Sequence, residues 1–185
     1  MLESMLNSKG GGMGKPALIV ADMLRDFLDP QGTLFVGERG LQIIPFVAQK
    51  ISEMRAKGAV IIFLNDSHEP DDREFARFPP HCVRNTPGAE LIPQLRMEPG
   101  DYRVEKTRFS GFYGTDLDKI LAAEQVTEVH LVGVCTSICI METASDLLDR
   151  DFPVVVYRAG VADLNPQEHE WALKRMTKIL GARVV

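Results

Sequence analysis

The sequence predicts a single-domain α/β protein, a three-layer sandwich in which helices flank a mostly parallel six-stranded sheet. Three observations support this fold class. Short apolar segments rich in β-branched residues alternate along the chain with segments of helical periodicity. Most of the strand segments are apolar throughout, which is typical of parallel strands covered on both faces. The length of 185 residues fits one domain, and the chain contains no internal repeat.

The predicted strands are short and end at polar or turn residues. Most of them consist of Val, Ile, Leu and Ala, which favour a buried pleated surface. In chain order they are residues 17–21, 59–64, 102–106, 129–134, 153–157 and 183–185.

Four helices are predicted between these strands. The first begins near Gln42 and ends at Gly58, and its apolar stripe is Ile43, Val47, Ile51 and Met54. The second covers residues 115–123, where Thr115 is the expected cap and Asp118 the acid of a capping box. The third and fourth cover residues 137–148 and 166–180, and a glycine ends the last one.

Three segments fall outside this alternation. Residues 1–15 are expected to form a flexible extension that precedes one domain, residues 16–185. Residues 24–40 are predicted to be irregular, and residues 67–100 form a long loop rich in proline and charge. A loop of that length in a compact domain is usually functional.

The composition argues against several kinds of partner. The net charge of −5 gives no reason to expect nucleic acid or an anionic membrane surface. No apolar run is long enough to span a bilayer. The cysteines are Cys82, Cys135 and Cys139, an odd number without the spacing of a disulfide framework. Because no signal peptide is recognisable either, we expect a reducing, cytoplasmic environment.

Cys139 is the central candidate for chemistry. It lies near the first turn of the helix predicted over residues 137–148, just after a predicted strand, where ligands bind in open α/β sheets. The free N–H groups and the dipole of a helix N-terminus lower the pKa of a thiol and favour the nucleophilic thiolate. The alternative is that Cys139 is a small buried hydrophobic residue.

Three other polar side chains are predicted to meet Cys139 at the same edge of the sheet. Asp22, Asp66 and Lys106 each end a predicted strand, and the carboxyl ends of parallel strands share one edge. One charged residue at a strand end is usually a solvated turn residue. Four groups from distant parts of the sequence indicate a site.

A second group of residues has the composition of a metal site. Asp66 and His68 are two residues apart, so in an extended segment both side chains point the same way, and His81 supplies a third ligand from the long loop. One carboxylate and two imidazoles suit Zn²⁺, Fe²⁺ or Mn²⁺ and leave coordination positions open. By contrast, His130 in a predicted strand and His169 in the last helix are expected to be structural.

Five segments carry a family resemblance and follow one another in the family's order. They are residues 17–27 (ALIVADMLRDF), 65–68 (NDSH), 78–90 (FPPHCVRNTPGAE), 105–112 (EKTRFSGF) and 133–139 (GVCTSIC). Together they resemble the isochorismatase-like cysteine hydrolase superfamily and, within it, the nicotinamidases and pyrazinamidases. The resemblance implies an isochorismatase-like, Rossmann-like fold and identifies residues 16–185 as a cysteine hydrolase domain.

The resemblance implies a catalytic role for several of the candidates. Asp22, Lys106 and Cys139 match the catalytic triad of the family. The backbone N–H groups of Cys135 and Cys139 match the groups that receive the oxyanion. The peptide bond between Val134 and Cys135 matches a bond that is cis in family members.

The resemblance also implies a metal ion. Asp66, His68 and His81 match the family's metal ligands, with Zn²⁺ as the expected ion and Fe²⁺ or Mn²⁺ as alternatives. Some relatives use a further carboxylate from the same loop, and Glu74 is the candidate here. The alternative is that Glu74 is a solvated surface charge.

Two aromatic residues match the walls of the substrate pocket in the family. Phe27 and Phe78 correspond to positions that flank the pyridine ring. Ser137 and Phe109 depart from the pattern, because many nicotinamidases have Asp at the first position and some have Tyr at the second.

These matches lead to an expected function. The chain is expected to be a nicotinamidase that converts nicotinamide to nicotinate and ammonia through a Cys thioester, acts in NAD salvage and forms a homo-oligomer. One alternative is a related amidase that acts on a carbamoyl, ureido or other small amide. Another is a metallohydrolase in which metal-bound water attacks and Cys139 is structural. A non-enzymatic nucleotide-binding module is the third, although no glycine-rich turn follows the first predicted strand.

Overall fold

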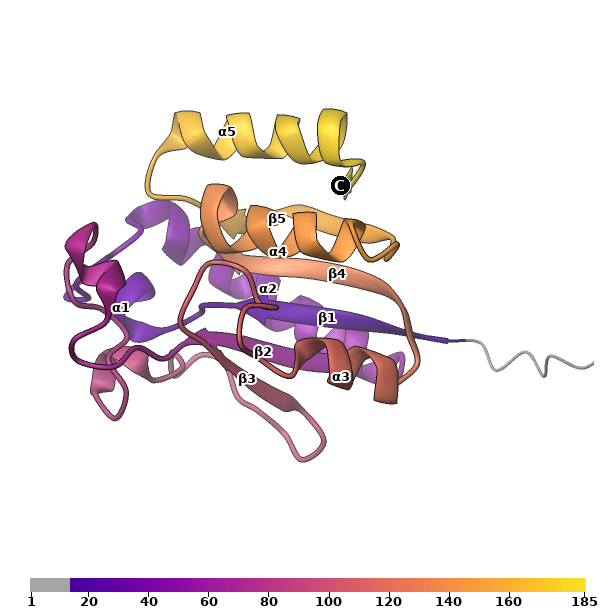
Figure 1. Ribbon diagram of the computed structural model, residues 1–185, viewed down its shortest axis with the longest axis horizontal. Helices are drawn as coiled ribbons and strands as arrows, with labels where there is room; N and C mark the ends of the chain where they lie inside the picture. Colours follow the sequence, from indigo (N-terminus) through magenta and orange to yellow (C-terminus); the bar gives the residue numbers. More distant parts are fainter. Residues whose placement is uncertain (1–13) are drawn as a thin grey trace, which may run out of the picture.

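Apolar strands form the centre of the structure, a computed structural model that describes residues 14–185 (Figure 1). Residues 1–13 of the expected extension lie outside the described residues, while Lys15 already belongs to the first strand. The six strands form one parallel sheet with helices on both faces, which confirms the predicted fold class.

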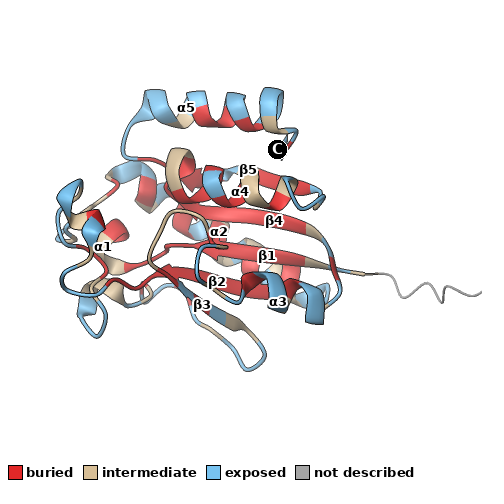
Figure 2. Cartoon of the chain, in the orientation of Figure 1, coloured by how far each residue is buried: buried red, intermediate tan, exposed pale blue. Residues whose placement is uncertain are grey.

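The strand order is β3-β2-β1-β4-β5-β6. The strands are β1 (Lys15–Ala21), β2 (Val60–Asp66), β3 (Tyr102–Lys106), β4 (Val126–Val134), β5 (Val154–Ala162) and β6 (Arg183–Val184). The two central strands, β1 and β4, are buried along most of their length because apolar side chains leave both of their faces (Figure 2). Each of the six predicted strands is present, although β4 begins at Val126 rather than Val129 and β5 extends beyond Tyr157.

The helices divide between the two faces of the sheet. They are α1 (Arg25–Leu28), α2 (Glu38–Ala56), α3 (Leu117–Ala123), α4 (Met141–Leu148) and α5 (Pro166–Arg175). The apolar side chains of α1 and α2 pack on one face, and those of α3, α4 and α5 pack on the other. In Figure 1, α3 and α4 lie in front of the sheet and α2 lies behind it. Within residues 14–185, no helix is long and apolar enough to cross a membrane.

Several element boundaries differ from the sequence-based predictions. The segment predicted to be irregular contains α1, and α2 begins at Glu38 rather than near Gln42. Gly40 disfavours a helix locally, but a Cβ there would lie 2.8 Å from a methyl group of Leu28, so close packing accounts for the glycine. β5 continues to Ala162 because, after an irregularity in the register, it pairs again with the end of β4.

The predicted cap of α3 is wrong by one residue. Asp116 is the N-cap of this helix, and its side chain accepts no capping hydrogen bond. The hydroxyl of Thr115 accepts the N–H of Leu117 at 3.2 Å and donates to the carbonyl oxygen of Gly111. Thr115 therefore stabilises the helix start from outside the helix, and the capping box with Asp118 does not form.

The turn after β4 differs most from a regular helix start. Residues Thr136–Ile140 form one turn of π-helix before α4, so Cys139 lies in a widened turn rather than in an α-helix. The peptide bond between Val134 and Cys135 is cis, as expected. Gly133 has φ of 117°, and a Cβ there would lie 2.0 Å from the carbonyl oxygen of Ala21. The end of β4 thus approaches the end of β1 closely.

Candidate active site

The candidate site lies where the order of the strands reverses. From β1 the chain continues to β2 and β3 on one side of the sheet and then returns to β4 on the other side. Neighbouring loops that leave the sheet in opposite directions create a crevice at the carboxyl ends of such strands. Asp22 directly follows β1, and Cys139 lies in the turn after β4. The geometry therefore places both at the crevice.

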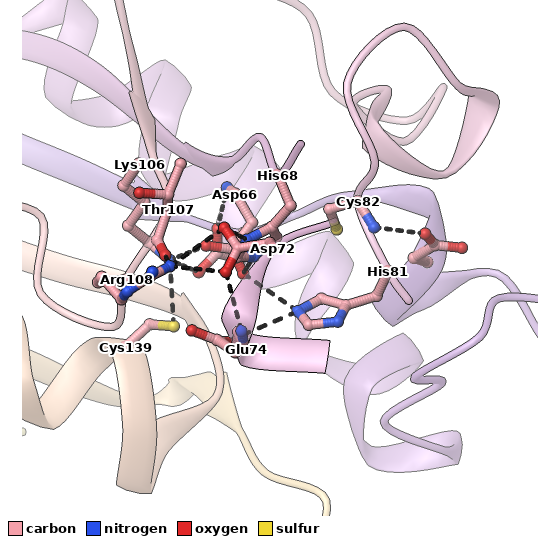
Figure 3. Close-up of polar contacts among 12 residues, drawn as sticks. Asp66, His68, Asp72, Glu74, His81, Cys82, Lys106, Thr107, Arg108 and Cys139 are labelled. Atoms are coloured by element: carbon pink, nitrogen blue, oxygen red, sulfur yellow. Dashed lines mark hydrogen bonds and ion pairs between the residues drawn. The ribbon is translucent and has the colours of Figure 1, made fainter. Parts of the chain in front are cut away.

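Lys106, the last residue of β3, joins the predicted groups at this edge (Figure 3). Its Nζ lies 2.9 Å from Oδ2 of Asp22 and 3.2 Å from Sγ of Cys139, and it donates to Oδ1 of Asp66. The four side chains are almost completely buried. The predicted convergence of strand-end residues is therefore observed.

The ammonium group of Lys106 occupies the position that a cation would otherwise take. Ligating atoms of Asp22, Asp66 and Cys139 lie within 4.8 Å of one another, which alone resembles a metal site. Because Lys106 contacts all three residues, its positive charge is the counter-ion of this cluster.

Burial and charge act in opposite directions on these groups. Burial lowers the pKa of Lys106, but Asp22 and Asp66 outweigh it and raise that pKa well above its usual value. Burial, together with the charge of Asp66, raises the pKa of Asp22 to about 6 even though Lys106 lowers it. For Asp66, Lys106 and the two neighbouring histidines outweigh burial and hold the pKa below its usual range. Lys106 and Asp66 therefore stay charged, while Asp22 has a pKa suited to exchanging a proton near neutrality.

The expectation of a low thiol pKa for Cys139 is wrong. Burial raises its pKa well above the usual value, and the ammonium of Lys106 only partly opposes this effect. Cys139 is one of the buried residues of the π-turn, and removal of the thiolate from water disfavours its charged form. The resting residue is a thiol, and a base must remove its proton during attack. Asp22 is near enough to be that base.

A second cluster, consisting of Asp66, His68 and His81, lies on the other side of the Asp66 carboxylate. Nε2 of His68 and Nε2 of His81 lie 3.6 Å and 3.7 Å from the same oxygen, Oδ2 of Asp66. Nδ1 of His68 faces the carboxylate of Asp72 at 3.1 Å, and Nδ1 of His81 faces the carbonyl oxygen of Pro79 at 2.8 Å. Both acceptors require a proton on Nδ1, so in the neutral ring the lone pair lies on Nε2, the nitrogen that faces Asp66.

This cluster fits a divalent transition metal. Nε2 of His68 is buried and has no hydrogen-bond partner among residues 14–185, which is costly unless another group binds it. Ligating atoms of Asp66, His68 and His81 lie within 4.8 Å of one another, and the donor set of one carboxylate and two imidazoles is typical of zinc and iron sites.

Glu74 lies at the edge of this cluster. Its Oε1 is 3.9 Å from Nε2 of His81, and its Oε2 is buried without a hydrogen-bond partner in the described chain. Only 4% of the residue is exposed, so the alternative of a solvated surface charge is wrong. The compact set of ligating atoms does not include Glu74.

A pocket opens onto both clusters. Its polar lining comes from Asp66, Glu74, His81, Cys135 and Cys139. Its apolar collar consists of Phe27, Leu34, Phe78, Phe109, Ile138 and Leu164. The rings of Phe27 and Phe78 each stand edge-on to the imidazole of His81, with centroids 5.6 Å and 6.2 Å away, so the aromatic residues lie beside the metal cluster.

Several residues around the site have no clear signal in the sequence. Leu34, Ile138 and Leu164 reach the collar from three loops or turns that have no shared periodicity. The carboxylate of Asp72 faces Nδ1 of His68, and the only sign of this contact in the sequence is the spacing of four residues between them. Asp163, at the end of β5, accepts the N–H of Ser137 at 2.6 Å and so supports the turn that carries Cys139.

The other two histidines lie outside the site. His130 bonds the hydroxyl of Tyr157 and the carboxylate of Glu128 on the α2 face of the sheet. His169 bonds the hydroxyl of Thr136 at 2.8 Å and thereby joins α5 to the turn after β4. These contacts agree with the structural roles expected for both.

Comparison with known proteins identifies a family that this chain matches. The family model described as "Isochorismatase domain" matches residues 16–185. The crystal structure of nicotinamidase/pyrazinamidase PncA from Bacillus subtilis is 37% identical and covers 92% of this chain and 99% of its own, with a TM-score of 0.88.

Two further solved structures differ in the substrate that they name. A pyrazinamidase of Pyrococcus horikoshii in complex with zinc is 38% identical, covers 92% of this chain and 98% of its own, and has a TM-score of 0.87. An N-carbamoylsarcosine amidase from Thermoplasma acidophilum is 35% identical, covers 92% of this chain and 95% of its own, and has a TM-score of 0.84. Similarity of the whole chain therefore does not separate the two kinds of amide.

Removal of the Lys106 charge should destabilise the fold. Lys106→Met leaves two buried carboxylates side by side without a counter-ion, and breaking a buried ion pair in this way costs about 3–5 kcal/mol of unfolding free energy. Urea denaturation measures the difference. The matched control is Lys119→Met, which removes an exposed lysine paired with Asp116 and should leave stability nearly unchanged. Equal stability of the two variants would contradict the central role of Lys106.

Proposed function

The chain belongs to the isochorismatase family, and from this premise we propose that it is a nicotinamidase, which hydrolyses nicotinamide to nicotinate and ammonia. The observation that carries the proposal is the pocket. A collar with three phenylalanines surrounds a space that ends at Cys139 on one side and at the metal cluster on the other. A flat heteroaromatic amide has an apolar ring, a ring nitrogen and a carboxamide that suit these three features.

The collar also argues for a neutral substrate. Among the described residues that line the pocket there is no arginine or lysine, whereas Asp66 and Glu74 supply negative charge. An amide that also carries a carboxylate, such as a carbamoyl amino acid, would find no cationic side chain among these residues to pair with that carboxylate. Nicotinamide carries no charge to desolvate.

Cys139 would be the nucleophile. Its sulfur attacks the amide carbon while Asp22, with a pKa of about 6, takes the thiol proton. Lys106 would stabilise the negative charge both on Asp22 and on the sulfur, because it contacts both residues. The N–H groups of Cys135 and Cys139 would bind the oxyanion.

The thioester then forms and is hydrolysed. Asp22 passes the proton to the departing nitrogen, and ammonia leaves. A water molecule attacks the thioester, Asp22 takes its proton, and the proton returns to the sulfur as nicotinate is released. Each proton that Asp22 accepts is given up again, so one residue serves both half-reactions.

The metal cluster would orient the substrate. Asp66, His68 and His81 would hold one divalent ion, with Zn²⁺ the first choice, and Glu74 would complete the set as a further ligand. When bound, the ion supplies a Lewis acid for the ring nitrogen and so fixes the ring in the collar. Phe27 and Phe78 would form the walls on either side of the ring.

An amidase for carbamoyl amides is the second candidate, and the whole-chain similarity to an N-carbamoylsarcosine amidase favours it. Ammonia release from nicotinamide, pyrazinamide and N-carbamoylsarcosine separates the two candidates. We expect turnover of both aromatic amides and none of the carbamoyl compound. The opposite pattern would replace the proposed function by the second candidate. Loss of activity with a chelator but not with iodoacetamide would instead indicate a metallohydrolase.

Substitution of the nucleophile should abolish the reaction. Cys139→Ala removes the atom that forms the thioester, so ammonia release should fall to the buffer background while the thermal unfolding midpoint stays close to that of the wild type. Cys82→Ala, which removes another buried thiol, is the control and should keep most of the activity. Wild-type turnover by Cys139→Ala would rule out the covalent mechanism.

Metal content tests the ligand set. Protein purified without chelator should contain about one divalent ion per chain by elemental analysis, as expected for a site with three protein ligands. His68→Ala should lose the ion, because it removes the buried Nε2 that has no other partner in the described chain. His130→Ala is the matched control and should keep it. An unchanged metal content in His68→Ala would overturn the assignment.

The collar should determine the choice of substrate. Phe78→Ala removes one proposed wall, and the lost aromatic and apolar contact should raise KM for nicotinamide roughly ten-fold or more. The rate at which a small alkylating agent modifies Cys139 should change much less, since Phe78 lines the pocket, whereas Lys106 and Asp22 are not among its lining residues. A proportional loss of thiol reactivity would show that Phe78 supports the reacting groups instead.

A further inference from the structure

The carboxylate of Asp72 takes no part in the proposed reaction, yet it lies at the centre of a hydrogen-bond cluster behind the metal ligands (Figure 3). Its Oδ2 faces Nδ1 of His68 at 3.1 Å. Its Oδ1 accepts the backbone N–H of Glu74 at 2.9 Å. Nη1 of Arg108 lies 2.8 Å from Oδ1 and 3.1 Å from Oδ2.

Every one of these contacts requires an acceptor at position 72. The N–H of Glu74 and the guanidinium of Arg108 can only donate. Since an ionised carboxylate only accepts, Nδ1 of His68 must carry the proton as well. In the neutral imidazole, the form that binds a metal ion, Nε2 of His68 is therefore the unprotonated nitrogen, and it faces Asp66 at 3.6 Å.

Arg108 connects this cluster to the strand that carries Lys106. It stands two residues after Lys106, and Nη1 also donates to the carbonyl oxygen of Thr107. Through Arg108 and Asp72, the loop that holds His68 and Glu74 is tied to the end of β3. The metal cluster and the Lys106 cluster are thus joined by a second connection besides Asp66.

The pair differs from an ordinary surface ion pair. The side chain of Asp72 is 7% exposed, whereas Glu69 on the same loop is 57% exposed and pairs with Arg84. Exposed pairs contribute little because solvent screens them, whereas a buried acceptor with several donors determines the geometry of those donors.

We propose that Asp72 is a positioning residue of the metal centre, which holds His68 in the tautomer that binds a metal ion and is itself held by Arg108. The inference rests on the metal part of the proposed function. It does not depend on which amide is hydrolysed. Partners of this kind behind a metal-binding histidine typically contribute 10–100-fold to metal affinity.

Asp72→Asn tests the proposal with almost no change of shape. One side of an amide is a donor, so whichever way the new side chain turns, an NH₂ group would face a donor. The affinity for Zn²⁺, measured by competition with a chromophoric chelator, should fall about 10–100-fold. Glu69→Gln is the matched control, because it makes the same acid-to-amide change on the same loop in a side chain that pairs with Arg84 instead of His68. Its zinc affinity should equal that of the wild type.

Arg108→Gln provides a second variant that leaves the carboxylate in place. It should lower zinc affinity less than Asp72→Asn does, because Asp72 still accepts from His68. The thermal unfolding midpoints of the metal-free proteins, compared with that of the wild type, show whether each variant is folded.

Two results would overturn the inference: unchanged zinc affinity in folded Asp72→Asn, or an equal loss in Glu69→Gln, which would indicate a general effect of loop charge. The titration contains no substrate, so it separates this inference from the proposed function. A wild type that binds zinc but does not hydrolyse nicotinamide would refute the function alone. A wild type that binds no zinc would refute the metal site and the role of Asp72 together.

Discussion

The buried ammonium group of Lys106 is the interaction on which the rest of the site depends. Without it, Asp22, Asp66 and Cys139 would bring two carboxylates and a thiol together in a space closed to water. Removing one partner from such a cluster is far more costly than losing an exposed pair, because the remaining charges stay desolvated. The pKa values of the two carboxylates beside Lys106 differ. Lys106 keeps Asp66 ionised, while burial and Asp66 leave Asp22 with a pKa of about 6.

Asp66 connects the two halves of the site. One of its oxygens accepts from Lys106, the other faces the Nε2 atoms of His68 and His81, and its backbone N–H donates to Asp22 at 2.7 Å. A single carboxylate therefore belongs to both the proton-handling cluster and the metal cluster. This sharing explains why the two clusters lie only one side chain apart, close enough for one small molecule to reach both.

The parallel sheet fixes the relative positions of the residues at the site. Asp22, Asp66 and Lys106 end or directly follow three neighbouring parallel strands, which are paired residue by residue. Cys139 comes from the fourth, across the point where the strand order reverses. Rigid strands fix the backbone of Asp22, Asp66 and Lys106, whereas α1 and the loops contribute the collar and His81, a proposed metal ligand.

The sequence by itself determined the parallel sheet, the six strands and the meeting of strand-end residues, because buried strands have a continuous apolar pattern and parallel strands end at one edge. It did not determine the start of α2 at Glu38, the end of β5 or the cap of α3, since close packing and strand pairing outweighed local preference there. Only the tertiary structure decided that the Cys139 thiol has a raised pKa, that Asp72 lies behind His68, and that Leu34, Ile138 and Leu164 line the pocket. Desolvation and contacts between distant segments exist only in the folded chain, and no local pattern in the sequence records them.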